Sequence, residues 1–221
     1  MPSYNEAATI VAVATNVLAS PYTAQLVIVD DGSTDGTPEL AEKLDDPRVL
    51  VLRQARNLGK GAALRRGFAE VTSEFVIVQD ADLEYDPNDY PVVLEPLLQG
   101  QADVVFGSRF QAGRPHRVLY FWHSVGNKIL TLLSNMATNL NLSDMETGYK
   151  AFRREVIQSI VVEEDRFGFE PEVTARLAQR GCIFYEVGIR YHGRTYAEGK
   201  KIGLADAFRA LYAIIRYTVL P

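Results

Sequence analysis

Three acidic residues at alternate positions, Asp80, Asp82 and Glu84, closely follow the apolar run 75–78. Side chains of an extended segment alternate between its two faces, so Asp80 and Asp82 can point the same way. Carboxylates that lie so close repel each other unless a cation sits between them. Their oxygens suit Mg²⁺ or Mn²⁺, which bind a few carboxylates together with substrate phosphates. The spacing therefore indicates a candidate metal site, whose plain alternative is a solvated acidic loop.

A second acidic pair, Asp30 and Asp31, also ends an apolar run, at 26–29. Carboxylates in this position accept hydrogen bonds from a bound nucleotide in some α/β folds. The same pair, with the Ser and Thr residues that follow, also suits a polar turn that caps a helix. The pair by itself does not decide between a nucleotide-binding role and a purely structural turn.

The segment NLGKGAALRRG, at 57–67, joins a glycine turn to a helical pattern. It is not a P-loop, because Gln54 stands where that motif needs glycine and Gly61 where it needs Ser or Thr. A helix N-terminus next to Lys60 still favours an anion. The alternative is that the glycines only allow the turn.

The elements that position these residues alternate between strand and helix in the first half of the chain. Strands are predicted at 26–29, 48–54, 75–78 and 102–110, and helices at 7–18, 38–43, 57–71 and 89–98. This alternation predicts an α/β fold with a mainly parallel, Rossmann-like sheet flanked by helices. The polar clusters fall at strand carboxyl ends, where ligands bind in open α/β sheets.

The second half predicts more helix. The patterns indicate one or two apolar helices at 118–142, a turn and a helix at 144–160, a helix at 170–181, a strand at 182–193 and a final amphipathic helix at about 205–217. The chain has no internal repeat or linker, so residues 1–221 are expected to form a single domain.

Composition excludes several classes of protein. The 221 residues carry a formal net charge of −5, which argues against nucleic-acid binding. One cysteine, Cys182, forms no intrachain disulfide and fits a reducing compartment. The pattern predicts neither a signal peptide nor a transmembrane helix.

Eight motifs in order resemble those of family 2 glycosyltransferases with the GT-A fold, and most closely the polyprenyl-phosphate sugar synthases of the dolichyl-phosphate mannose synthase type. The matching segments are PSYNE (2–6), VDDGSTDGT (29–37), NLGKGAALRRG (57–67), QDADLEYDP (79–87), GSRF (107–110), DMETGYKAFRR (144–154), FGFEPE (167–172) and GRTYAEGKKIG (193–203). Together they cover nearly the whole chain, and the last four favour the lipid-phosphate branch.

The resemblance implies a role for each matching residue. The nucleotide sugar would be held by Pro2, Tyr4, Glu6, Asp31, Lys60, Asp80, Ala81 and Asp82. Mg²⁺ or Mn²⁺ would bind Asp80, Asp82 and Glu84. The acceptor and its phosphate would meet Arg109, Arg117, Arg194 and Lys200. Asp82, Arg109 and Arg194 would be the catalytic residues.

The implied reaction is an inverting transfer of a hexose, with mannose favoured and glucose next, from a nucleotide-diphosphate sugar such as GDP-mannose to a polyprenyl or dolichyl phosphate. A lipid monophosphate is already a nucleophile at neutral pH, because its second pKa is about 6. Such a reaction needs cations that bring two phosphates together rather than a strong base.

Two alternative functions remain open at this stage. A transferase acting on a carbohydrate hydroxyl would need a catalytic base, for which Glu170, Glu172 and Asp144 are candidates. A non-catalytic nucleotide-sugar binding protein would keep the donor residues without transfer.

The isoprenoid tail of such an acceptor implies contact with a membrane surface. The apolar segment 118–142 and the final helix are the candidate contacts, and packing on the core or on a second subunit is the alternative. The expected location is cytoplasmic, peripheral on the cytoplasmic membrane face, and an oligomer is compatible with the pattern.

The start of the chain departs from the family pattern. Relatives place an apolar strand before the PSYNE motif, whereas only Met1 precedes Pro2 here. The first strand of the sheet is therefore expected to be missing, by truncation rather than by loss of an inner strand, since each unpaired buried backbone group costs about 1–3 kcal/mol. An upstream apolar strand of about six residues is expected to stabilise the protein.

Overall fold

The computed structural model describes residues 1–111, 117–118, 120–194 and 204–219. The predicted site residue Lys200 lies outside these described residues.

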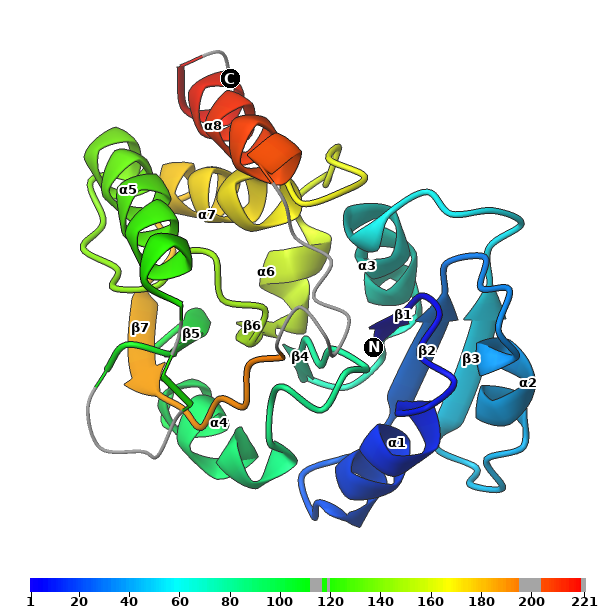
Figure 1. The fold of residues 1–221 in the computed structure, drawn as a ribbon. Coiled ribbons are helices and arrows are strands. Elements are labelled where there is room, and N and C mark those ends of the chain that lie inside the picture. The colour runs from blue at the N-terminus through cyan, green and yellow to red at the C-terminus, as the bar shows by residue number, and fades with distance from the viewer. Residues whose placement is uncertain (112–116, 119, 195–203, 220–221) are drawn as a thin grey trace.

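The first half of the chain forms a parallel sheet in the order β1-β2-β3, shown in blue to cyan in Figure 1. Its strands are β1 (Pro2–Ser3), β2 (Leu26–Asp30) and β3 (Val49–Arg53), and its helices are α1 (Ile10–Ala19), α2 (Thr37–Glu42) and α3 (Lys60–Glu70). Every residue of β2 is buried, as expected of a Val- and Ile-rich parallel strand covered on both faces. The alternation predicted from the sequence is confirmed here.

A second sheet has the order β4-β6-β5-β7 and is mixed. Its strands are β4 (Phe75–Ile77), β5 (Val104–Ser108), β6 (Lys150–Arg153) and β7 (Phe184–Gly188). β5 and β7 are parallel, whereas β6 is antiparallel to both of its neighbours. The short 3-10 turn η1 (Pro87–Asp89) and α4 (Tyr90–Leu98) connect β4 to β5. The sequence pattern predicted a turn and a helix at 144–160. The helix is present as α6 (Arg154–Gln158), but the strand β6 that precedes it was not predicted.

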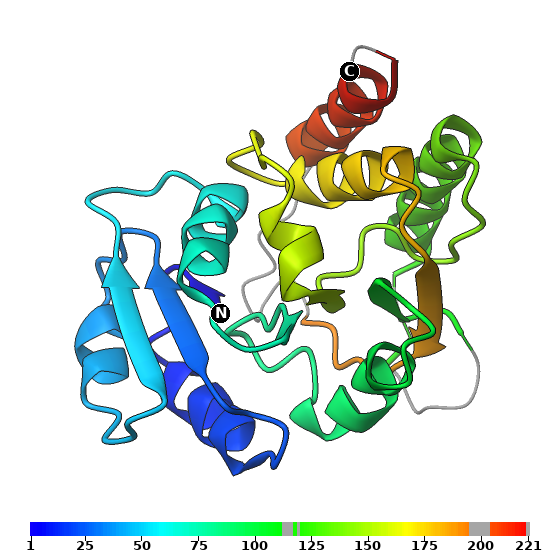
Figure 2. The same ribbon diagram turned by 180° about the vertical axis from the view of Figure 1, so that it is seen from behind.

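The remaining helices gather on one side of the molecule, beyond the second sheet (Figures 1 and 2). They are α5 (Phe121–Thr138), α6 (Arg154–Gln158), α7 (Phe169–Gln179) and α8 (Leu204–Val219). Ala213 and Tyr217 of α8 are buried against Ala175 of α7. The final helix predicted from the sequence is therefore present, and one of its faces belongs to the packed interior. Among the described residues, no helix has the length and apolar character needed to cross a membrane.

The two sheets face each other across the amino terminus, which lies between β2 and β4 in both ribbon views. β1 has only two residues, and its pairs with β2 are Pro2 with Val29 and Ser3 with Asp30. Among the described residues, β1 is the edge strand of the β1-β2-β3 sheet on the side that faces β4, and the expectation of a missing first strand stays a prediction.

Candidate active site

Two loops at the carboxyl ends of β1 and β2 are tied together by side chains. The Asn5 amide donates to the Ser33 hydroxyl at 2.9 Å, and the Thr34 amide donates to the Asn5 side-chain oxygen at 2.9 Å. Asn5 adopts a φ of 52°, a left-handed conformation that asparagine tolerates better than most residues. The Glu6 amide donates to Thr37 Oγ1 at 2.9 Å. Two motifs that lie far apart in the sequence therefore form one rim, with Tyr4 and Glu6 on it.

Asp31 lies in this rim, but its carboxylate serves the chain itself. It accepts hydrogen bonds from the amides of Leu58 at 2.8 Å and Gly59 at 2.7 Å, so it holds the turn that opens α3. Burial raises the pKa of Asp31 in spite of these bonds. Its neighbour Asp30 is also buried, and Asp30 Oδ1 has no hydrogen-bond partner in the part of the chain that the structure describes. Asp30 is therefore the carboxylate of the pair with acceptor capacity left for a ligand.

Lys60, the first residue of α3, reaches the acidic segment. Its ammonium lies 3.1 Å from Asp80 Oδ2 and 3.2 Å from Glu170 Oε1. Burial opposes the charge, but Asp80 and Glu170 together raise the pKa of Lys60 above its usual range. Lys60 is thus brought into the candidate site, as the sequence predicted, and it is paired with the first aspartate of the D-x-D motif.

The second aspartate of the motif is paired with an arginine from far along the chain. Arg194 Nη2 lies 2.7 Å from Asp82 Oδ2, and Arg194 Nη1 lies 3.2 Å from Glu6 Oε1. Glu84 Oε1 accepts from the Arg194 amide at 2.7 Å, and Glu84 Oε2 accepts from the Tyr191 hydroxyl at 2.8 Å. Arg194, Glu6, Asp82 and Glu84 therefore form one ionic cluster.

The three carboxylates predicted to hold a metal do not converge on a common point. Within the described ranges, no group of three His, Cys, Asp or Glu residues has the geometry of a metal site. Asp80 pairs with Lys60, whereas Asp82 and Glu84 face Arg194. The physical reason is repulsion between like charges, which separates carboxylates and draws the nearest cations onto them. The trio stays a prediction, and the structure adds that each of its carboxylates lies next to a cationic side chain.

The residues nevertheless fit a divalent cation. Burial, followed by the nearby charges of Asp80 and Glu84, raises the pKa of Asp82 to about 7, even though Arg194 opposes the shift. Burial is the largest cause of the shift, and Arg194 only partly offsets the repulsion from the two neighbouring carboxylates. Asp80 is also closely confined, because a Cβ on Gly148 would lie 2.5 Å from Asp80 Oδ2. The donor set of hard carboxylate oxygens suits Mg²⁺ or Mn²⁺.

Ala81, between the two aspartates, links this segment to the first loop. Its carbonyl oxygen accepts from the Thr9 hydroxyl at 2.6 Å, and its side chain is buried. The Thr9 hydroxyl also lies 3.1 Å from Glu6 Oε2. The backbone at Ala81 is therefore fixed to the start of α1. Pro2, also predicted to border the donor, is the first residue of β1.

Arg109 directly follows β5, and its guanidinium forms an ion pair with the buried carboxylate of Asp144. Its Nε and Nη2 each lie 2.7 Å from an oxygen of Asp144, in a bidentate pair, and Nη2 also donates to Asn127 at 3.0 Å. The Arg109 guanidinium lies 5.2 Å from the ring centroid of Tyr191. Nη1 is the nitrogen that makes none of these bonds. Arg117 lies near the same region, since its Nη1 donates to the Gly193 carbonyl at 3.1 Å.

The three candidate bases have different surroundings. Asp144 is bound by Arg109, and Glu172 accepts from the amides of Glu163 and Glu164 at 2.8 and 2.7 Å, so both carboxylates hold the fold together. Glu170 differs because its Oε2 is buried without a hydrogen-bond partner among the described residues. Glu170 thus remains the candidate base with an unused oxygen.

Two titratable side chains near the site, Glu146 and Lys150, were not recognised from the sequence. Burial, then the charge of Glu170, raises the pKa of Glu146 to about 8. Burial lowers the pKa of Lys150 to about 8, and its ammonium donates to the carbonyls of Met145 and Thr147. Lys150 therefore fixes the loop that carries Asp144 and Glu146. Lys150 begins β6, the strand that the sequence pattern did not predict, so hydrophobic periodicity gave no sign that its side chain is buried.

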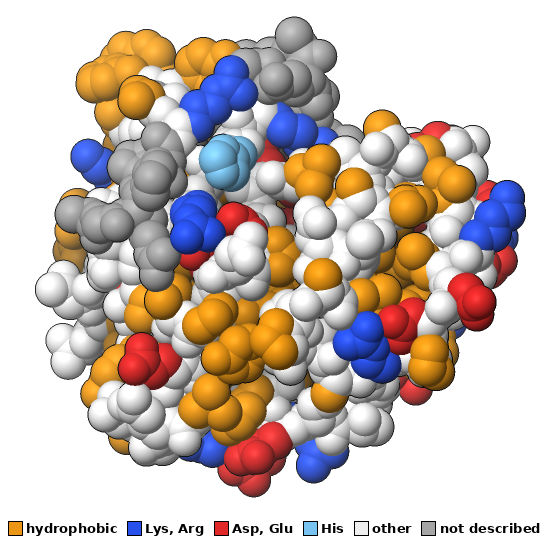
Figure 3. Space-filling model, turned by 90° about the horizontal axis from the view of Figure 1, so that it is seen from below, with side chains coloured by type: hydrophobic (Ala, Val, Ile, Leu, Met, Phe, Trp, Pro, Cys, Tyr) orange, Lys and Arg blue, Asp and Glu red, His pale blue; other side chains and the backbone are white. Residues whose placement is uncertain are grey.

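The molecule is a mixed α/β protein whose acidic and basic site residues gather at strand carboxyl ends. On the face shown in Figure 3, basic and acidic side chains are interspersed with hydrophobic ones. Residues 1–161 match the family described as Glycosyl transferase family 2, which covers well over half of the chain. The chain belongs to glycosyl transferase family 2.

Three relatives match most of this chain. Glycosyltransferase AglJ of Haloferax volcanii is 34% identical over 194 residues, which are 87% of this chain and 62% of that protein. Polyprenol monophosphomannose synthase of Mycolicibacterium smegmatis is 30% identical over 217 residues, 92% of this chain and 80% of that protein. Undecaprenyl-phosphate 4-deoxy-4-formamido-L-arabinose transferase of Aeromonas hydrophila is 30% identical over 224 residues, 97% of this chain and 65% of that protein. The chain spans less than two thirds of the length of two of these relatives.

The fold is shared with solved glycosyltransferase structures. Glucosyl-3-phosphoglycerate synthase from Mycobacterium tuberculosis, in complex with Mn²⁺, UDP and phosphoglyceric acid, matches all of this chain and 77% of its own length, with a TM-score of 0.77 and 22% identity. Another complex of that enzyme, with Mn²⁺, UDP and glucosyl-3-phosphoglycerate, gives a TM-score of 0.75 at 21% identity, over all of this chain and 78% of its own. At this identity the similarity establishes the GT-A-type fold, and the fold predicted from the sequence is confirmed.

Proposed function

We propose that this chain is an inverting glycosyltransferase domain, with 1–221 as one unit, that moves a hexose from a nucleotide-diphosphate sugar to a polyprenyl phosphate. Mannose from GDP-mannose is the first choice and glucose the second. The observation that carries the proposal is an ionic cluster at the D-x-D segment. In it the guanidinium of Arg194 lies next to the carboxylates of Glu6, Asp82 and Glu84. The names of two relatives, which specify polyprenol and undecaprenyl phosphate chemistry, support this acceptor class.

The donor would lie over the rim formed by the first two loops. Pro2, Tyr4 and Glu6 would border the nucleoside, and Asp31 would support it through the turn that it holds. Asp80 and Asp82, with Glu84 beside them, would hold Mg²⁺ or Mn²⁺. When bound, the ion neutralises charge that develops on the leaving diphosphate. The Mn²⁺ in solved relatives of this fold supports a divalent cation.

The acceptor end would be built from arginines. Nη1 of Arg109, which Asp144 leaves unused, would contact a phosphate, while Asp144 fixes the direction of the guanidinium. Arg194 would exchange its carboxylate partners for phosphate oxygens, and Arg117 and Lys200 would add positive charge. Because the nucleophile is a phosphate oxygen, the task is to bring two anions together. This fits the use of Asp144 and Glu172 as structural carboxylates.

Membrane contact would come from α5 and α8. Each helix exposes large apolar side chains: Phe121, Trp122, Ile129, Leu132 and Met136 on α5, and Phe208, Tyr212 and Ile215 on α8. The two helices pack together, so these side chains belong to neighbouring elements. An apolar helix face of this kind can lie in the lipid headgroup region. The protein would then act at the cytoplasmic membrane face without crossing the membrane.

One observation favours a second candidate function. Glu170 Oε2 is buried and unpartnered among the described residues, as a base awaiting a proton would be. A hydroxyl acceptor, such as a carbohydrate, needs such a base, whereas a phosphate acceptor does not.

Transfer from radiolabelled donors separates these functions. GDP-mannose and UDP-glucose would each be offered with Mn²⁺ and a polyprenyl phosphate, a sugar alcohol or no acceptor. The proposal expects a lipid-extractable product, and a loss of about 10²–10³ in turnover for Arg109→Ala and Arg194→Ala. Arg109→Lys should recover only part, since a point charge does not replace a bidentate fork. If Glu170→Ala is dead while both arginine variants stay active, the lipid-phosphate assignment is wrong.

A further inference from the structure

The carboxyl group of Glu146 has hydrogen-bonding capacity that the chain does not use. Its Oε1 is buried and has no hydrogen-bond partner in the part of the chain that the structure describes. A buried polar atom left without a partner destabilises the fold, so each such atom calls for an explanation. The residue as a whole is only partly buried. Because the last torsion of a glutamate side chain rotates easily, the unpartnered oxygen can turn towards a ligand.

The backbone that carries Glu146 is fixed on both sides. The Lys150 ammonium donates to the carbonyls of Met145 and Thr147, which are the residues before and after Glu146. The Met145 amide donates to the Thr131 hydroxyl at 3.2 Å. A side chain on a backbone held in this way loses little further freedom when it binds a ligand. Glu146 is therefore presented to the site by a preorganised loop.

The same loop connects the two ends of the candidate site. Asp144, two residues before Glu146, forms the ion pair with Arg109. Gly148, two residues after Glu146, lies against the D-x-D segment, since a Cβ there would be 2.5 Å from Asp80 Oδ2. Two residues of chain span at most about 7 Å, so the backbone of Glu146 lies within that distance of both ends. In the proposed function these ends hold the acceptor phosphate and the donor diphosphate, and the transferred sugar lies between them.

The surroundings of Glu146 suit a hydroxyl group better than a phosphate. Burial, then the charge of Glu170, raises the pKa of Glu146 to about 8, while Lys150 and Arg109 oppose the shift. A carboxyl group with this pKa is mainly protonated at neutral pH, so it can donate one hydrogen bond and accept others. A sugar hydroxyl also donates and accepts, and it carries no charge. A phosphate only accepts, and it would be repelled by the neighbouring carboxylate of Glu170.

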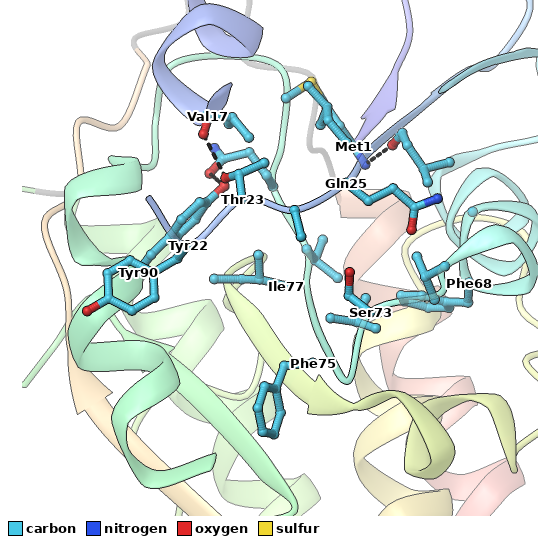
Figure 4. Close-up of a pocket in the computed structure, with 18 of the residues that line it drawn as sticks. Met1, Val17, Tyr22, Thr23, Gln25, Phe68, Ser73, Phe75, Ile77 and Tyr90 are labelled. Atoms are coloured by element: carbon cyan, nitrogen blue, oxygen red, sulfur yellow. Dashed lines mark hydrogen bonds between the residues drawn. The ribbon is translucent and has the colours of Figure 1, made fainter. Parts of the chain in front are cut away.

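A cavity elsewhere in the molecule does not include this oxygen. A space of about 290 Å³ lies between β2 and β4 and is lined mainly by apolar side chains, such as Phe68 and Ile77 (Figure 4). Glu146 is not among the residues that line it. The unpartnered oxygen therefore belongs to the region between Arg109 and the D-x-D segment.

We propose that the carboxyl group of Glu146 contacts a hydroxyl group of the transferred hexose and thereby helps to select the sugar. The inference rests on the function proposed above, because it takes the donor to be a nucleotide sugar. The arginines and the D-x-D carboxylates of that proposal serve the phosphates, whereas Glu146 recognises the sugar itself. A site that hydrogen-bonds a substrate hydroxyl rejects an analogue without it more strongly than an apolar pocket does.

Calorimetric titration with Mn²⁺ present separates the sugar contact from the phosphate contacts. GDP, UDP, GDP-mannose and UDP-glucose are each titrated into the parent protein, Glu146→Met and Glu155→Met. Glu155 is the matched control, because it is an exposed glutamate on α6. Glu146→Met is expected to bind the nucleotide alone as the parent does, and to bind its sugar conjugate about tenfold more weakly. Glu155→Met should bind both as the parent does.

Donor analogues that lack one sugar hydroxyl identify the contact. Each ring hydroxyl of the donor that binds is removed in turn, and every analogue is titrated into the parent and into Glu146→Met. One analogue is expected to bind the parent about tenfold more weakly than the complete donor, but the variant no more than about twofold more weakly, because groups in contact are not additive. Glu146→Ala replaces Glu146→Met in both titrations if circular dichroism shows that the methionine variant is unfolded.

Three results would overturn the proposal. The first is equal affinity of the parent and the variant for the sugar conjugate. The second is an equal loss for the nucleotide alone, which would mean that Glu146 only supports the loop. The third is the same loss in both proteins for every analogue. Each of these leaves the proposed function intact, whereas failure of the parent to bind either nucleotide sugar would contradict both.

Discussion

At the scale of single residues, most charged side chains of the site are already joined in ion pairs. Arg194 forms ion pairs with Asp82 and Glu6, and Lys60 forms ion pairs with Asp80 and Glu170. A divalent cation and a diphosphate would replace these pairs by others of the same kind: the cation takes the carboxylates, and the phosphates take the freed arginine. The exchange costs little because neither the acids nor the arginine is left buried without a partner.

Removing Arg194 should therefore affect metal binding and transfer in opposite directions. In Arg194→Ala the carboxylate of Asp82 is released, so Mn²⁺ affinity without nucleotide is expected to rise about two- to fivefold, the range of a partly exposed ion pair. Titration of free Mn²⁺ by electron paramagnetic resonance measures this. Arg190→Ala is the matched control, because Arg190 pairs instead with Asp86 at 3.1 Å. A fall in Mn²⁺ affinity for Arg194→Ala would contradict the exchange.

Gly148 should be required for the position of Asp80. The added methyl group of Gly148→Ala would lie 2.5 Å from Asp80 Oδ2, so the carboxylate must move. We expect Mn²⁺ affinity to fall by about tenfold, which corresponds to about 1.4 kcal/mol. In Gly126→Ala the new Cβ meets nothing within 4 Å, and this α5 variant should bind Mn²⁺ normally and be as stable or more so. Equal Mn²⁺ affinities in both variants would count against the confinement of Asp80.

Glu146 should make the protein less stable as pH rises towards 8. Its pKa in the fold is about 8, compared with an ordinary value of 4.5, so the folded state holds an extra proton between these values. Stability that this proton provides is complete below about pH 4.5 and is lost as pH rises through 8, with a slope of at most about 1.4 kcal/mol per pH unit. Glu146→Gln should flatten the dependence between pH 5.5 and 8. Urea unfolding at both pH values measures the difference, and parallel curves for the two proteins would refute it.

At the scale of elements, α8 serves two environments. Its Ala213 and Tyr217 pack on α7, while Phe208, 72% exposed, and Ile215 face outward. Both readings of this helix from the sequence, core and interface, are therefore compatible with its structure. Deleting the helix would remove a buried face, so substitutions on the exposed face are the cleaner test.

The exposed faces of α5 and α8 should govern binding to lipid. Trp122→Glu and Phe208→Glu each place a charge on an outward apolar position, so co-sedimentation with anionic liposomes is expected to fall severalfold at unchanged Tm. Leu98→Glu on α4 is the control, because Leu98 is an exposed apolar residue on another part of the molecule. If all three variants sediment like the parent protein, these helices are not the lipid-binding surface.

At the scale of the whole molecule, β1 and β4, which belong to different sheets, both lead directly into the site. β1 continues into Tyr4 and Glu6, and β4 continues into Asp80 and Asp82. The relative position of the two halves of the donor site therefore depends on how β2 and β4 are held apart.

The sequence was sufficient for much of this arrangement. Apolar runs that precede Asp31 and Asp80 correctly predicted β2 and β4. In the parallel strand β2 every residue is buried, which is why its sequence is continuously apolar. The sequence was insufficient for β6, since Lys150 and Arg153 are charged and only tertiary pairing places them between two strands. The bidentate pair of Arg109 with Asp144 also joins residues 35 positions apart, which no local pattern reveals. Motif order predicted which residues gather, but not which of them neutralise one another.

In the function proposed above, a divalent cation held by the D-x-D carboxylates would bind the diphosphate of a nucleotide sugar. Calorimetric titration of GDP-mannose and of UDP-glucose, with Mn²⁺ and then with EDTA in place of it, tests this most directly. Binding of at least one donor is predicted with Mn²⁺, with loss of most of it in EDTA and in Asp82→Ala, while circular dichroism shows that the variant remains folded. Donor affinity that is unchanged by EDTA would contradict the claim.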